Sequence, residues 1–128
     1  MTRRKRIQFW GRDKDDDSLV LEILRGEKTA TVCEVDDYYV SDGDFDDGNL
    51  LPGELVEVYD LRENLRCLIQ ITEVYKVRWD NIPEKLWRGE ACRDEKHFKD
   101  AHIFCWPEYN ITDEFEMMAT HFKLIEEY

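Results

Sequence analysis

The first half of the chain carries a helical pattern of hydrophobic residues followed directly by a strand pattern. Apolar residues recur at helical spacing between positions 18 and 25, after Asp17 or Ser18 as a candidate N-cap. Gly26 is the candidate residue that ends this helix, and residues 29–35 are rich in the β-branched types that favour strands. The pattern therefore predicts a helix that turns at once into a strand.

The rest of the chain predicts a hairpin, a helical region and a last strand. The predicted elements are strands at 54–61 and 66–78 joined by a turn at 62–64, helices at 83–87 and 94–104, and a strand at 115–125. Residues 36–52 are acidic and contain glycine, which indicates a long loop. No βαβ repeat occurs, so we predict an α+β fold with a mostly antiparallel, barrel-like sheet.

Composition supports one folded domain over residues 1–128. Hydrophobic residues make up 42% of the 128 residues, and these include 4 Trp, 6 Tyr and 6 Phe, so a core is expected despite 38% charged residues. The net charge is −12, with 30 acidic residues against 18 Lys and Arg. Because proteins bind nucleic acid largely through cations on phosphates, this charge disfavours general RNA binding. A small nucleoside, or a short nucleotide at a local basic patch, remains compatible with it.

The cysteines and the ends of the chain indicate a cytoplasmic protein. The four cysteines are widely spaced without a CxxC pair, and the N-terminus has no apolar run typical of a signal peptide. No stretch is apolar enough to span a membrane, so no membrane partner is expected. The basic cluster at 2–6 is interpreted as a solvated terminus.

The acidic loop contains part of a calcium-binding spacing. Asp42, Asp44 and Asp46 match the first ligands of an EF-hand loop. The pattern then fails, because Asp47 stands where glycine is needed and Gly53 stands where the last glutamate is needed. We interpret the segment as a solvated acidic loop.

A zinc site is also disfavoured. Cys92, His97, His102 and Cys105 are all residue types that bind zinc, but their separations match neither a finger nor a ribbon. The histidines are expected to be ordinary core or surface residues. We expect no metal and no cofactor, and the sequence contains no GxSxG, P-loop, GxGxxG or HExxH motif.

The stretch GEKTATV, residues 26–32, allows two interpretations. Lys28 lies at the turn from helix to strand, with Thr31 just beyond it, so both side chains have fixed backbones. A desolvated lysine can act as a base for a threonine nucleophile. Alternatively, Lys28 complements the helix C-terminus and the threonines are ordinary strand residues. Spacing alone favours this second, structural interpretation.

The same stretch resembles the G-x-K-T-x-T motif of the ASCH (activating signal cointegrator homology) domain, a family of the PUA-like superfamily. The resemblance continues in order through SLVLEILRGEKTATV, the hairpin that begins LPGELVEVYD, HFKDAHIFC and YNITDEFEMMATHFKLI, and covers residues 9–126. It implies a PUA-like, mostly antiparallel β-barrel with flanking helices. Residues 1–8 would be a basic tail on a single domain.

The resemblance also implies a cleft that binds a nucleoside or nucleotide. One bacterial branch of the family is an amidohydrolase that removes the acetyl group of N4-acetylcytidine with a Lys, a Thr and a Glu. The matching residues here are Lys28, Thr31 and Glu90, the last within WRGEA. Other members are predicted to bind RNA, and one is reported as a ribonuclease. Further candidates for substrate contacts are Thr29, Tyr39 and Arg88.

The sequence departs from the amidohydrolase branch in two places. Cys33 stands where that branch has arginine, and the acidic loop at 36–52 is an addition. The chain is closer to a longer bacterial ASCH subgroup. Three functions therefore stay open at this stage: an amidohydrolase of a modified nucleoside, a non-catalytic RNA-binding or nucleotide-binding module, and a ribonuclease. A protein-interaction domain that uses the acidic loop is a further alternative.

Overall fold

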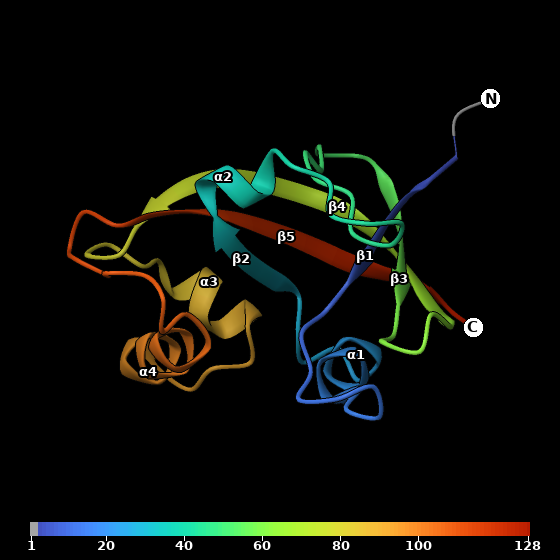
Figure 1. The fold of residues 1–128 in the computed structure, drawn as a ribbon, viewed down its shortest axis with the longest axis horizontal. Helices are drawn as coiled ribbons and strands as arrows, with labels where there is room; N and C mark the ends of the chain where they lie inside the picture. Colours follow the sequence, from blue (N-terminus) through green and yellow to red (C-terminus); the bar gives the residue numbers. More distant parts are fainter. Residues whose placement is uncertain (1–2) are drawn as a thin grey trace.

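A computed structural model describes residues 3–128, and its centre is one curved sheet of five strands (Figure 1). The strands lie in the order β1-β3-β4-β5-β2 and span β1 Lys5–Gln8, β2 Ala30–Glu34, β3 Leu55–Tyr59, β4 Leu65–Arg78 and β5 Glu116–Glu127. Only the β1–β3 pair is parallel, and the other three pairs are antiparallel. The sheet curls into a half-barrel, which confirms the predicted α+β fold with a mostly antiparallel sheet.

Four helices flank the sheet: α1 Ser18–Leu24, α2 Val35–Tyr38, α3 Glu84–Gly89 and α4 Glu95–Cys105. In Figure 1, α3 and α4 lie below one end of the sheet, α1 lies below the other, and α2 lies on the opposite side. The sequence predicted α1, α3 and α4 close to these bounds. No helix among residues 3–128 has the length and apolar character needed to cross a membrane.

The α2 helix is a short addition that the sequence pattern did not predict. It occupies the start of the segment expected as a loop, where the Glu34 side chain accepts a hydrogen bond from the Asp36 N–H. The buried Tyr38 hydroxyl donates to the Leu50 carbonyl. An N-cap and one buried ring thus suffice to order this part of the acidic segment.

The prediction of a solvated basic tail is wrong for the residues that the structure describes. Residues 5–8 form β1, in which Ile7 is buried and pairs with Val58 of β3. Asp47 of the acidic loop accepts the Arg3 guanidinium at 2.8 Å and the Arg6 N–H at 2.9 Å. The loop therefore supplies the negative charge that holds this cationic strand in place. Residues 1 and 2 of the predicted tail lie outside the described residues.

The sheet separates two hydrophobic cores. Met118 and Phe122 of β5 pack with α1 residues in the first core, whereas Met117 and Ala119 pack with α3 and α4 residues in the second. Side chains alternate between the faces of a strand, so β5 contributes to both cores. The ends of α1 and α3 meet β2 where the two cores adjoin, and the candidate site lies there.

Candidate functional site

The end of α1 fixes the backbone of Lys28. Gly26 has φ +78°, and its N–H donates to Ile23 O at 3.0 Å while the Glu27 N–H donates to Glu22 O at 2.9 Å. These two bonds form a Schellman motif, which confirms Gly26 as the residue that ends the helix. The Lys28 N–H also donates to Glu22 O, at 3.1 Å. Lys28 therefore leaves the helix in a single direction, toward β2.

The end of α3 brings Glu90 beside Lys28. The two residues form an isolated antiparallel β-bridge, and the Thr29 N–H donates to Gly89 O at 2.6 Å. A Cβ atom on Gly89 would lie 2.7 Å from the Ala30 Cβ, which is too close for any side chain. The missing side chain at Gly89 therefore allows α3 to end directly against β2.

The Lys28 ammonium is buried and fully engaged. Its side chain is 3% exposed, and Nζ donates to Glu90 Oε1 at 2.9 Å and to Ala30 O at 2.7 Å. Nζ also lies 5.5 Å from the centroid of the Phe9 ring, within cation–π range. A buried charge is tolerated when several partners of this kind replace its water.

His102 of α4 is the third polar partner and was not among the predicted site residues. Its Nε2 lies 2.9 Å from Glu90 Oε2, and its Nδ1 lies 2.7 Å from Phe98 O. Burial acts to raise the pKa of Glu90, but the charge and hydrogen bond of Lys28, together with the nearby His102 ring, outweigh it and lower the pKa. Glu90 is therefore held as a carboxylate. No sequence motif or spacing around His102 points to the site. His102 reaches Glu90 because α4 packs against α3.

Glu22 is a second carboxylate near Lys28, and its pKa is shifted in the opposite direction from that of Glu90. Its side chain is half-buried on α1, and burial raises its pKa, although the Lys28 charge acts in the other direction. Paired carboxylates whose pKa values are pushed apart by their surroundings are a recurrent arrangement in acid–base sites. Around Lys28 there is thus one carboxylate held ionised, that of Glu90, and another that protonates more readily, that of Glu22.

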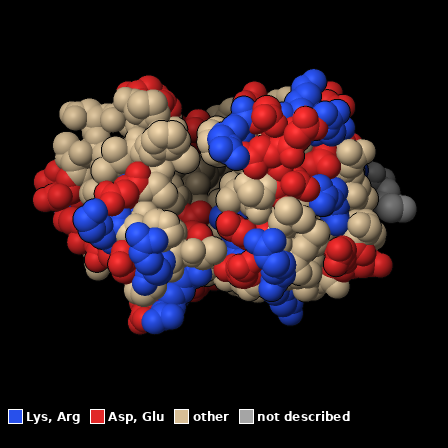
Figure 2. Space-filling model, turned by 90° about the horizontal axis from the view of Figure 1, so that it is seen from below, with Lys and Arg blue, Asp and Glu red and all other residues tan. Residues whose placement is uncertain are grey.

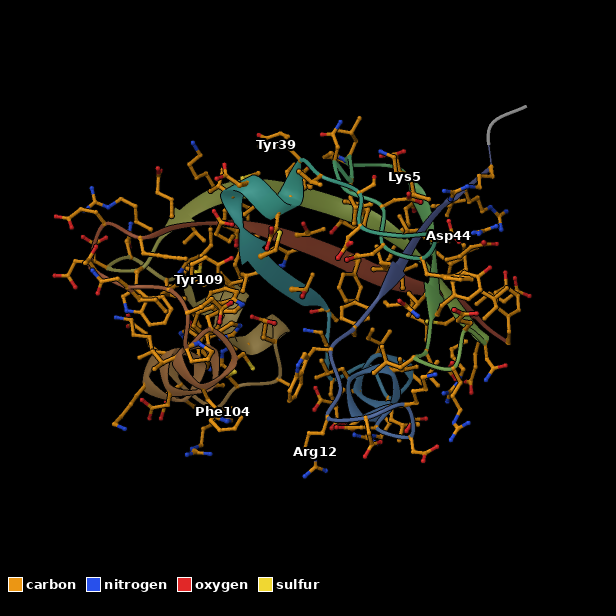
Figure 3. The ribbon with its side chains drawn as sticks, in the orientation of Figure 1. Lys5, Arg12, Tyr39, Asp44, Phe104 and Tyr109 are labelled. Atoms are coloured by element: carbon orange, nitrogen blue, oxygen red, sulfur yellow. The ribbon has the colours of Figure 1, made fainter. Side chains whose placement is uncertain are left out.

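The molecular surface carries a groove on the side of the helices (Figure 2). Figure 2, seen from below, shows a groove between the part that carries α3 and α4 and the part that carries α1. Lys28 follows α1 and Glu90 follows α3, so their bridge joins these two parts of the molecule, with side chains that are 3% and 9% exposed. Figure 3 shows Arg12 and Phe104, one from each side of the groove, pointing to solvent below it.

A second hollow, of about 320 Å³, lies at the start of α1 and is separate from the groove floor. It is lined by Arg12, Ser18, Leu21 and four aspartates. Asp15 and Asp17 of this group pair with Arg62 and Arg66. None of the predicted site residues lines it, so we place the candidate site at the Lys28–Glu90 pair.

Thr31 lies in β2 near this pair without contacting it through a hydrogen bond in the described part of the chain. It is half-buried and pairs across the strands with the buried Thr120. Alternation places both threonines on the face of the sheet that carries Phe122. Phe9 packs against Phe122 at a centroid distance of 6.3 Å and also contacts Lys28. Phe9 therefore connects Lys28 with the core on that face, and Thr31 is near Lys28 along the chain.

The other predicted substrate contacts are scattered. Thr29 is exposed beside the Lys28–Glu90 bridge. Arg88 is exposed, pairs with Glu84 at 2.7 Å and covers the Trp87 ring. Tyr39 is 60% exposed and lies beyond α2, on the side away from α3 and α4 (Figure 3). The structure thus brings together Lys28, Glu90 and Thr29, with Thr31 close by, and leaves Tyr39 elsewhere.

Within residues 3–128, no group of three or more His, Cys, Asp or Glu side chains is placed to hold a metal ion. The acidic loop and the Cys92–Cys105 segment, which contain the two weak metal patterns of the sequence, form no such group. The described cysteines are all free thiols. The titratable groups gathered around Lys28 are therefore two glutamates and a histidine.

Fold and site define a small α+β domain whose half-barrel holds a buried lysine–glutamate pair at the seam between two cores. The family model of the ASCH domain matches residues 5–126, and the chain belongs to this family. A search of curated proteins gave no match.

Solved structures share this fold at low sequence identity. A protein from Enterococcus faecalis V583 gives a TM-score of 0.73 at 15% identity, over 100% of this chain and 84% of that one. An ASCH domain from Lactobacillus crispatus JV V101 gives 0.72 at 21% identity, over 97% and 82%. A mutant of an ASCH protein from Zymomonas mobilis gives 0.53 at 12% identity, over 95% and 70%. Identities this low establish similarity of fold.

Proposed function

We propose that the groove binds a nucleoside-like ligand and that the chain hydrolyses an N-acyl group on it, as in N4-acetylcytidine. The observation that carries this proposal is the Lys28 side chain, 3% exposed, with Nζ 2.9 Å from Glu90 Oε1. A buried ion pair stabilises a fold no better than apolar residues of the same volume. Such a buried pair, in which the surroundings lower the pKa of Glu90, is a candidate for chemistry.

The acylation step uses the pair as a proton relay. Lys28 Nζ passes a proton to Glu90, and the neutral amine then takes the proton of Thr31 Oγ as that oxygen attacks the acyl carbon. When the C–N bond breaks, the carboxyl proton of Glu90 moves to the departing exocyclic nitrogen. The products of this step are the free amine and an acyl ester on Thr31, with Lys28 and Glu90 back in their original charge states.

The deacylation step consumes one water. Water gives a proton to the Glu90 carboxylate as its oxygen attacks the ester carbon. The ester bond then breaks, and Thr31 Oγ takes the proton back from Glu90. Acetic acid leaves and ionises in solvent, so the sum is one amide and one water converted into one amine and one acid.

Charge supports a nucleoside over RNA as the ligand. The net charge is −12, and two basic residues near the N-terminus are already paired, Arg3 with Asp47 and Lys5 with Glu54. Arg88 is paired with Glu84. Phosphate contacts by Lys and Arg make binding fall steeply with salt, whereas a nucleoside carries no phosphate. We therefore expect turnover to be nearly independent of salt concentration.

Release of acetate from N4-acetylcytidine tests the proposal. Thr31→Val removes the hydroxyl while keeping the shape, and we expect kcat/KM to fall by about 10²–10⁴-fold, the usual range for loss of a positioned catalytic group. Thr72→Val, at an exposed position of β4, is the matched control and should keep the wild-type rate. Acetate release by Thr31→Val at the wild-type rate would refute the role of Thr31, and no release by the wild type would refute the activity.

A further inference from the structure

The His102 ring has one nitrogen whose proton is fixed by geometry. Nδ1 lies 2.7 Å from the carbonyl oxygen of Phe98, one turn earlier on α4. A carbonyl oxygen only accepts hydrogen bonds, so Nδ1 carries a proton and donates it. Whether Nε2 also carries a proton then depends on what it faces.

Nε2 faces the carboxylate of Glu90. It lies 2.9 Å from Oε2, and the alignment is too poor for a regular hydrogen bond, which leaves the buried Oε2 without one among the described residues. At this separation two lone pairs would repel each other in a buried site. A proton on Nε2 or on Oε2 removes that repulsion and turns the contact into an attraction.

We propose that His102 is a positioning residue of this site, which shares a proton with Glu90 Oε2 and so holds Glu90 Oε1 against Lys28. The proposal concerns the site of the proposed function and rests on that function for its catalytic meaning. During turnover the proton on the His102 side stays in place, while the proton that Glu90 receives and returns moves through Oε1. His102 thus stabilises the carboxylate each time Glu90 has given its proton away.

The other titratable groups around Glu90 do not replace His102 in this role. Burial raises the pKa of Cys92 to about 11 and also raises the pKa of Cys105, so both thiols are neutral near pH 7. Burial lowers the pKa of His121, which lies 2.8 Å from the Tyr75 hydroxyl. Glu22 brings negative charge from α1. Among residues 3–128, only Lys28 and His102 bring a side-chain nitrogen close to the Glu90 carboxylate.

A titration without substrate tests the proposal. The side-chain carboxyl carbon of Glu90 is followed by ¹³C NMR against pH in wild type, His102→Asn and His102→Gln. Asparagine reproduces the donor at Nδ1 only, whereas glutamine can place an N–H where Nε2 lies. We expect the midpoint for Glu90 to move to higher pH in His102→Asn and to return toward wild type in His102→Gln.

Two results would overturn the proposal. One is a Glu90 midpoint at the same pH in wild type and in His102→Asn. The other is a folded His102→Gln variant whose Glu90 titrates like that of His102→Asn.

In the acetate assay, the acid limb of the kcat/KM profile should move to higher pH in His102→Asn, in step with the NMR midpoint. Absence of acetate release from the wild type would refute the proposed function, while the NMR midpoints still decide the role of His102.

Discussion

Replacing Lys28 by methionine lowers the free energy of unfolding by about 3–5 kcal/mol at pH 7, because it leaves a buried carboxylate without its partner. Glu90 is 9% exposed and faces the Lys28 ammonium at 2.9 Å. Urea denaturation measures the change. In wild type the lowered pKa of Glu90 contributes stability above the pKa of an unfolded glutamate, and this contribution is lost as pH falls through the folded value. In the variant the Lys28 charge no longer opposes burial and His102 alone does so, so the pKa of Glu90 rises and the two proteins converge in stability at acid pH.

Two further variants control this prediction. Lys76→Met removes an exposed lysine that lies 4.0 Å from Glu116, and a surface pair of this kind contributes no more than about 1 kcal/mol. The double variant Lys28→Met with Glu90→Leu replaces both charges by apolar groups and should recover most of the loss. A Lys28→Met protein as stable as wild type at pH 7 would contradict a buried ion pair at this position.

Phe98→Ala lowers the free energy of unfolding by about 3–5 kcal/mol, the usual cost of emptying a buried phenylalanine site. Phe98 is 0% exposed at the centre of the second core, with ring centroids 6.4 Å from Trp79 and 4.1 Å from His102. The substitution also removes the surface on which the His102 ring rests. We therefore expect the Glu90 midpoint in the NMR titration to move in the same direction as in His102→Asn.

The same helix offers a matched control. Phe104 is 78% exposed on α4, and Phe104→Ala should change the free energy of unfolding by no more than about 0.5 kcal/mol in urea denaturation. Equal losses for Phe98→Ala and Phe104→Ala would contradict the position of the second core between α4 and the sheet.

The elements that the sequence predicted are those whose pattern is local. α1 has helical spacing and a glycine at its end, and β4 and β5 are long enough for their β-branched and apolar content to be clear. β1 was missed because Ile7 is the only buried residue among cations, and its strand forms only when it pairs with β3, far along the chain. α2 was missed because its order depends on Tyr38 reaching Leu50.

The candidate site was predictable only in part, because the contacts that form it join residues far apart in the sequence. The motif GEKTATV and its resemblance to ASCH domains pointed to Lys28, Thr31 and Glu90, and the structure brings Lys28 and Glu90 into contact across 62 positions of sequence. Spacing alone could not show that contact, because it needs Gly89 to approach Ala30. His102 and Glu22 join the site through helix packing, which leaves no local pattern in the sequence.

A crystal of the Thr31→Val variant soaked with N4-acetylcytidine shows whether the Lys28–Glu90 pair forms the floor of a ligand site. We expect ligand density in the groove between α1 and α3, with an acyl oxygen at hydrogen-bond distance, about 3 Å, from Lys28 Nζ. Density that lies only in the acidic hollow at the start of α1 or beside Tyr39, with the Lys28–Glu90 pair untouched at saturating ligand, would contradict it.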